Sequence, residues 1–190
     1  MSISYYDTNS AAFFAGSVAA DMSAGRARFL AHVPTGGAIL DAGCGSGRDT
    51  LAFKQAGFAV TAFDASAEMV RLSREHSGLP VLHLRFADLQ WDCAFDGVWT
   101  CASLLHVPRA DLEDAMARLA RALKPGGAWF ISFKYGDTER FTDRHFTDMN
   151  EALLTATIAR TGLTAIDMWT STDVRPERAT ERWISAIAKR

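Results

Sequence analysis

The sequence predicts an α/β protein of the doubly wound, Rossmann-like class, with a seven-stranded, mostly parallel sheet and an antiparallel edge hairpin. In the first two-thirds of the chain, short apolar runs alternate with helical patterns at about 20 to 30 residues per unit, which is typical of βαβ units. A glycine-dense turn follows the first apolar run, within residues 39–50. The last two apolar runs have no helical pattern between them, which predicts an antiparallel pair.

An N-terminal helical segment, residues 1–37, is expected to precede the core. Residues 10–32 are rich in alanine, with phenylalanine and other apolar anchors. Gly16 and Gly25 interrupt this pattern, so it predicts two helices or one broken helix. Pro34 and the Gly36-Gly37 pair close the segment.

A cofactor-binding core is expected over residues 38–134. Short apolar runs between turn signals predict its strands at 38–42, 58–63, 79–86, 95–101 and 128–133. One helix should start at Ser46 or Gly47 and end near Ala56, before Gly57. A second should run from the N-cap Ser66 to about residue 75.

Pro108 and Asp111 should start an amphipathic helix, and residues 124–127 should end it in a turn. Its apolar stripe comprises Leu112, Ala115, Met116, Leu119, Ala120 and Leu123. Residues 135–190 are expected to supply the substrate side and the edge strands of the same single domain, 1–190. There, 136–144 is polar and irregular, 148–161 is helical, and 163–169 and 183–188 are strands joined by a polar loop.

The composition and net charge of the chain limit the classes of partner that we expect. Of the 190 residues, 48% are hydrophobic and 22% charged, as in soluble globular proteins. The net charge of −2 gives no electrostatic sign of nucleic acid or of an anionic membrane. The three cysteines form no Cys-x-x-Cys and the five histidines have no metal-ligand spacing. With no apolar run of transmembrane length and no secretory pattern, we expect a cytoplasmic, metal-free monomer or homodimer.

The glycine turn is a candidate nucleotide site. Gly43, Gly45 and Gly47 have the spacing Gly-x-Gly-x-Gly, and glycine lets a ligand approach the backbone closely. The dinucleotide fingerprint requires a third glycine where this chain has Arg48, and the Gly-Lys-Ser/Thr of a phosphate loop is absent. Asp64 follows Gly43 by 21 residues, where an acceptor-only carboxylate can bind both hydroxyls of a ribose.

The stretch Asp41-Ala42-Gly43-Cys44-Gly45-Ser46-Gly47 resembles the first motif, Asp-x-Gly-x-Gly-x-Gly, of the class I S-adenosylmethionine-dependent methyltransferases. Further resemblances lie in residues 95–107, which match the fourth strand and the substrate-facing loop, and in the turn 123–127. Together they cover residues 29–134. The Gly47-Arg48-Asp49 ending, the short chain and Tyr5-Tyr6-Asp7 look most like small bacterial enzymes of tellurite or thiopurine-like detoxification.

The resemblance implies that S-adenosylmethionine is the cofactor and that its methyl group passes to a small molecule. It places Asp64 at the ribose and Asp88 at the adenine amino group. The full set of implied cofactor residues is Asp41, Gly43, Cys44, Gly45, Arg48, Asp64, Ala65, Met69, Ala87, Asp88, Leu89, Cys101, Ala102 and Ser103. Alternatives are methylation of RNA or of a protein side chain, a cofactor-binding module without catalysis, and an NAD-type dehydrogenase.

Candidate acceptor-side groups are His106, Tyr6, Tyr5, Tyr135, Arg144 and Arg175. His106 follows the fourth strand, and a histidine can act as general base if the acceptor carries a proton; it can equally cap the Pro108 turn. Tyr5 and Tyr6 can close over the sulfonium, or belong to an arm packed on the surface. Arg144 and Arg175 can hold an anionic substrate, or be solvated surface charges.

Overall fold

The computed structural model describes residues 2–190 and contains a seven-stranded sheet with the strand order β3-β2-β1-β4-β5-β9-β8. Strands β1 to β5 are parallel, and β9 and β8 add to β5 as an antiparallel pair at the edge. The bounds are β1 Ala38–Ala42, β2 Ala59–Asp64, β3 Val81–His83, β4 Phe95–Thr100, β5 Leu123–Lys134, β8 Thr164–Thr172 and β9 Arg182–Lys189. The predicted fold class is confirmed.

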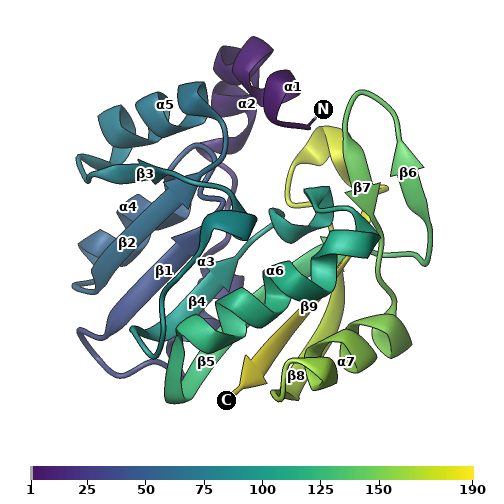
Figure 1. Cartoon of the computed structure of the whole chain (residues 1–190). Coiled ribbons are helices and arrows are strands. Elements are labelled where there is room, and N and C mark those ends of the chain that lie inside the picture. Colours follow the sequence, from purple (N-terminus) through teal and green to yellow (C-terminus); the bar gives the residue numbers. More distant parts are fainter. Residues whose placement is uncertain (1) are drawn as a thin grey trace.

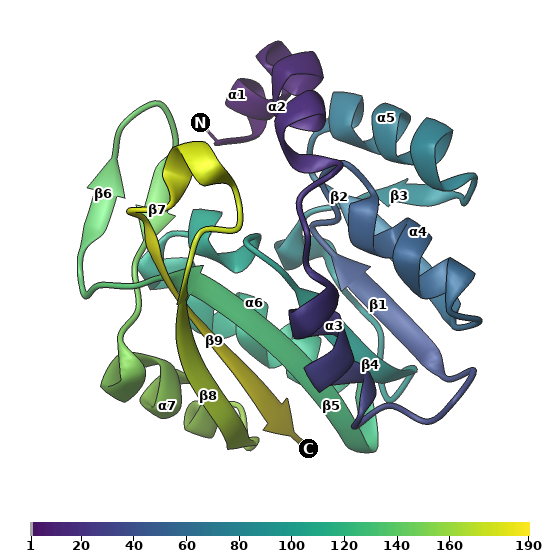
Figure 2. The same ribbon diagram turned by 180° about the vertical axis from the view of Figure 1, so that it is seen from behind.

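Helices cover both faces of this sheet (Figures 1 and 2). One face carries α3 (Ser23–Leu30), α4 (Arg48–Gln55) and α5 (Ala67–Ser77), and the other carries α6 (Arg109–Ala122) and α7 (Glu151–Arg160). The chain builds outward from β1 to β3 and then from β4 to β5, so the order reverses between β1 and β4. In open α/β sheets, ligands bind at the carboxyl ends of the strands at such a reversal.

Two apolar layers hold the helices on the sheet. The stripe predicted for α6 is buried, with Leu112, Met116 and Leu119 at most 2% exposed. On the opposite face, Trp99 stacks on Phe130 at 3.8 Å between ring centroids. These layers fix the strand ends, and with them the loops that form the site.

Several local predictions are also confirmed. The first strand has the predicted bounds, and Ser66 caps α5 by accepting a hydrogen bond from the Met69 N–H at 3.2 Å. The predicted third strand is longer than β3, because the chain turns into the 3-10 turn η1 (Phe86–Asp88), where the Asp88 carboxylate accepts a hydrogen bond from the Arg85 N–H at 3.1 Å. The predicted turn at 124–127 lies inside β5, where a register shift against β4 accommodates it.

The N-terminal segment is helical as predicted, but helix α1 (Ser2–Thr8) precedes α2 (Ser10–Ser17), so helix begins before the alanine-rich stretch. The segment predicted as irregular contains an unexpected hairpin of β6 (Glu139–Phe141) and β7 (His145–Thr147). The Ser2 hydroxyl accepts a hydrogen bond from the His145 N–H at 3.1 Å, so α1 lies beside the hairpin (Figure 1). Two further 3-10 turns are η2 (Leu104–His106) and η3 (Pro176–Arg178). Within residues 2–190, no helix combines the length and apolar character needed to cross a membrane.

Candidate functional site

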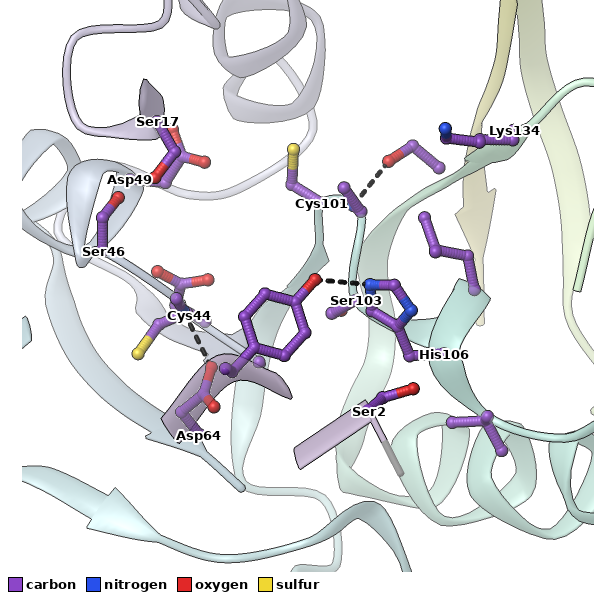
Figure 3. A pocket seen from close by; sticks show the side chains of 18 of the residues that line it. Ser2, Ser17, Cys44, Ser46, Asp49, Asp64, Cys101, Ser103, His106 and Lys134 are labelled. Carbon is purple, nitrogen blue, oxygen red and sulfur yellow. Dashed lines mark hydrogen bonds between the residues drawn. The ribbon is translucent and has the colours of Figure 1, made fainter. Parts of the chain in front are cut away.

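A cavity of about 680 Å³ lies at the carboxyl ends of the parallel strands, between the glycine loop on one side and α1, η2 and the β6–β7 hairpin on the other. Figure 3 shows Cys44, Ser46, Asp49 and Asp64 on the glycine-loop side, and His106 and Lys134 across the cavity from them. All the residues predicted for the site line it except Tyr5, Asp88, Leu89 and Tyr135.

Left-handed glycines shape the wall at the end of β1. Gly43, Gly45 and Gly47 have φ values of 76°, 54° and 75°, a conformation that L side chains rarely adopt. A Cβ on Gly43 would lie 2.5 Å from the Cβ of Ser103, whose hydroxyl donates to the Ala42 carbonyl at 2.7 Å. The loop is therefore a tight turn whose bare backbone borders the cavity.

Asp64 ends β2 beside this loop. One carboxylate oxygen accepts a hydrogen bond from the Gly45 N–H at 2.8 Å, and the other accepts from the Ser66 N–H at 2.9 Å. Desolvation raises the pKa of Asp64 although these N–H donors oppose it. Each carboxylate oxygen keeps a further lone pair, so Asp64 can accept two hydroxyl donors from the cavity.

A charged network lies beneath the loop. Asp49 accepts hydrogen bonds from Arg26 and Arg48, each at 2.6 Å, and from the Trp99 indole at 3.0 Å. Burial would raise the pKa of Asp49, but the two arginines outweigh it and lower that pKa. For Asp41, burial and then the charge of Asp49 raise the pKa to about 7, against a hydrogen bond from the Thr50 hydroxyl at 2.6 Å.

A hydrogen-bonded chain forms the opposite wall. The Nδ1 atom of His106 lies 2.7 Å from the His145 carbonyl, which can only accept, so Nδ1 carries the ring proton. The Nε2 atom is then the acceptor, and the Tyr6 hydroxyl donates to it at 2.6 Å. Burial lowers the pKa of His106 to about 4, and the nearby Arg144 adds to this effect. The imidazole is neutral at pH 7.

The two predicted arginines have different surroundings. Arg175 is held by Asp173, with nitrogen–oxygen distances of 2.9 and 2.7 Å. Arg144 donates to the Tyr6 hydroxyl at 3.2 Å, and its guanidinium carbon lies 4.4 Å from the centroid of the Tyr5 ring. Tyr5 therefore reaches the site through Arg144, although it does not line the cavity.

The other predicted residues outside the cavity have other partners. Asp88 binds the Arg85 guanidinium through both oxygens at 3.0 Å, and Leu89 is 1% exposed in the apolar core. The Tyr135 hydroxyl donates to Glu151 at 3.0 Å. Asp88 therefore does not line the cavity, although its neighbour Ala87 does.

Sequence reasoning did not select Asp49, Lys134 or Phe146, which also line the cavity. Lys134 could have been found, since it ends the fifth strand at the same sheet edge as Asp41 and Asp64. Phe146 gives no such signal, because it reaches the site only through the unexpected hairpin.

The cysteine thiols at the cavity are not activated nucleophiles. Burial raises the pKa of Cys101 to about 12, and also raises that of Cys44. Within residues 2–190, no group of three or more histidine, cysteine or acidic side chains is placed to hold a metal ion.

Comparison with known sequences places this site in context. Residues 39–127 match the family model of a methyltransferase domain. The ubiquinone biosynthesis O-methyltransferase of Xylella fastidiosa is 39% identical over 110 residues, 53% of this chain and 44% of that protein. The cypemycin N-terminal methyltransferase of Streptomyces sp is 36% identical over 106 residues, 53% and 43% of the two chains. The chain spans about half the length of the curated relatives it matches.

Solved structures share the fold over the whole chain. The 1,6-didemethyltoxoflavin-N1-methyltransferase of Burkholderia thailandensis, solved with S-adenosylhomocysteine, has a TM-score of 0.79 at 24% identity and covers 99% of this chain and 84% of its own. The magnesium protoporphyrin IX methyltransferase of Synechocystis has a TM-score of 0.78 at 16% identity, covering 99% and 97%. At these identities the likeness concerns the fold.

Proposed function

Because this chain carries a class I methyltransferase domain, we propose that it transfers a methyl group from S-adenosylmethionine to a small-molecule acceptor. The observation that carries the proposal is the cavity itself. One volume of about 680 Å³ is bounded by the glycine loop and Asp64 at one end and by Tyr6 and His106 at the other. A cofactor and an acceptor can therefore meet in it without leaving the protein.

The residues at the glycine-loop end fit the cofactor. The cavity volume lies within the roughly 300–1,000 Å³ of ligand pockets. Gly43 and Gly45 would lie against the amino acid part, and Asp64 would accept the two ribose hydroxyls. Asp41, Asp49 and Asp64 line this end together with Arg48, which pairs with Asp49.

The acceptor would occupy the end that Tyr6 and His106 form. When bound, S-adenosylmethionine supplies an electrophilic methyl carbon and leaves as the neutral thioether. The protein's own contribution is to hold a nucleophile in line and to exclude water, and proximity of this kind is worth effective molarities on the order of 10⁵ M or more. Helix α1 contributes by placing Tyr6 in the cavity wall.

Tyr6 and His106 can handle an acceptor proton. As a proton moves from the acceptor to the Tyr6 oxygen, the Tyr6 proton can pass along the 2.6 Å hydrogen bond to His106 Nε2. The imidazolium so formed keeps its Nδ1–H bond to the His145 carbonyl. Since the pKa of His106 is about 4, the Tyr6–His106 pair is a weak base. It takes a proton most readily from an acceptor whose own pKa is low.

Methyl transfer from labelled S-adenosylmethionine to a panel of thiols, phenols, amines, small carboxylates and tellurite tests the proposal. We expect label in at least one small molecule, and slower transfer in Tyr6→Phe for an acceptor that must lose a proton. Label found only in RNA or in protein added to the same assay would contradict the small-molecule assignment. Binding of S-adenosylhomocysteine without transfer to any acceptor would favour a cofactor-binding module.

A further inference from the structure

Two cations of the cavity lining lie at the end that Tyr6 and His106 form. Lys134 and Arg144 lie there beside Phe146, whereas Asp41, Asp49 and Asp64 lie at the glycine-loop end together with Arg48. Figure 3 shows Asp49 and Asp64 on one side and Lys134 on the other. Complementary charge favours binding, so these two cations bear on the charge of whatever occupies this end of the cavity.

Arg144, at this end of the cavity, has a hydrogen-bond donor left unsatisfied by the described part of the chain. It is 9% exposed, and its Nε atom is buried with no hydrogen-bond acceptor within residues 2–190. Within that part of the chain, the one carboxylate within 4.0 Å is that of Asp143, at 3.7 Å, and its side chain is 50% exposed. A buried cation without a close counter-ion is costly, and in native proteins it is normally paired.

Aromatic rings surround Arg144 but do not replace a counter-ion. Its guanidinium carbon lies 4.4 Å from the centroid of Tyr5, 5.0 Å from that of Phe146 and 5.7 Å from that of Tyr6. Ring faces attract a cation, yet they offer no lone pairs to the guanidinium N–H groups. The rings hold the planar guanidinium group of Arg144 in place beside the cavity.

The neighbouring cations are compensated within the protein. Lys134 lies 2.6 Å from a Glu181 oxygen, and Arg175 lies 2.7 Å from an Asp173 oxygen. The Lys134 ammonium is also 4.8 Å from the centroid of Phe146, the ring that Arg144 contacts. Arg144 therefore carries the least compensated charge of the three at this end.

We propose that the methyl acceptor carries an oxyanion, a carboxylate or a phosphate, that binds the Arg144 guanidinium. The inference rests on the proposed function, since it assigns the acceptor to the end of the cavity away from the glycine loop. A guanidinium is suited to this ligand, because its planar N–H groups match two oxygens of a carboxylate or phosphate. The aromatic rings beside it suit an acceptor with a flat body.

The hydrogen-bonded chain is consistent with an acceptor of this kind. Arg144 and Lys134 both oppose protonation of His106, whose pKa is about 4. A base this weak deprotonates a neutral alcohol or amine poorly at pH 7. An acceptor whose reacting group is already an anion does not need this base. The negative charge of such an acceptor, beside Arg144, also favours protonation of His106.

Titration calorimetry on the full chain saturated with S-adenosylhomocysteine tests the proposal with two probes of one shape, benzoate and benzamide. We expect benzoate to bind about tenfold or more tightly than benzamide, which is the scale of one charge-assisted hydrogen bond. In Arg144→Gln this preference should disappear while the affinity for S-adenosylhomocysteine stays within twofold. Arg144→Lys keeps the positive charge but loses the paired N–H groups of the guanidinium, so it should retain part of the preference for benzoate.

The matched control is Arg182→Gln, which removes a positive charge from an exposed residue that does not line the cavity. It should bind both probes as the wild type does. Inorganic phosphate in a further titration identifies the source of the oxyanion. Arg144-dependent binding of phosphate that exceeds that of benzoate would support the proposal with a phosphate ester as the acceptor.

Three results would overturn the proposal. They are equal affinity of the wild type for benzoate and benzamide, no binding of either benzoate or phosphate, and an unchanged benzoate preference in Arg144→Gln. If Arg144→Gln does not fold, the wild type titrated at low and high ionic strength decides, since the preference for benzoate must weaken with salt. Failure of S-adenosylhomocysteine to bind at the first step would instead refute the proposed function.

Discussion

Asp64→Asn is the substitution that tests the proposed cofactor end most sharply. The variant keeps the size of the side chain but replaces one acceptor oxygen with an amide donor. In the wild type, both carboxylate oxygens already accept backbone N–H bonds, from Gly45 at 2.8 Å and from Ser66 at 2.9 Å, and each would accept a ribose hydroxyl as well. A hydrogen bond to a charged group contributes about 1.5–3 kcal/mol, so we expect about 10- to 150-fold weaker binding of S-adenosylhomocysteine.

Calorimetry at a temperature well below the unfolding midpoint measures this loss. The midpoint itself must be recorded for each variant, because an amide facing the Gly45 or Ser66 N–H also lowers the stability of the loop. Asp92→Asn is the matched control, since Asp92 is an exposed carboxylate that does not line the cavity. Affinity of Asp64→Asn within twofold of the wild type, in a protein shown to be folded, would refute the assignment of Asp64 to the ribose.

Three further predictions follow from the same geometry. Asp88→Asn should change cofactor affinity less than twofold by calorimetry, because Asp88 does not line the cavity and pairs with Arg85; a tenfold loss would restore its predicted adenine contact. Gly43→Ala should lower the free energy of unfolding by about 2–4 kcal/mol in urea titrations, from positive φ and the clash with Ser103, and no loss would show that the loop can rearrange. Folding lowers the pKa of His106 from its ordinary 6.5 to about 4. Between pH 6.5 and pH 4 the unfolded state therefore binds one more proton than the folded state. The free energy of unfolding consequently falls as the pH drops through that range. The stability deficit of His106→Gln should therefore shrink from pH 7 to pH 5 in matched urea titrations, and a constant deficit would contradict the lowered pKa.

Much of the glycine-loop end of the cavity could be predicted because its signals are local. The glycines Gly43, Gly45 and Gly47 are required by positive φ, and Ser66 is an N-cap that the next three residues identify. Asp64 follows from its place at the end of a strand. These features depend on neighbours within a few residues, so a single sequence contains them.

The end of the cavity at Tyr6 and His106 could be predicted only in part, because long-range contacts build it. No residue of helix α1 is fully buried, and a hydrogen bond from the Ser66 hydroxyl to Asp7 at 2.6 Å helps to hold it against α5. The β6–β7 hairpin is polar in sequence and is held by the ion pair of Arg140 with Asp148. Neither contact follows from periodicity or from spacing along the chain. The tellurite or thiopurine-like subtype, the cytoplasmic location and the oligomeric state stay predictions.

Calorimetry of the wild-type chain with S-adenosylhomocysteine and, separately, with NADH tests the central claim most directly. The glycine spacing and Arg48, which stands where a dinucleotide loop would have glycine, both favour the former. The account predicts one S-adenosylhomocysteine bound per chain and no measurable heat with NADH. Binding of NADH without S-adenosylhomocysteine would contradict it.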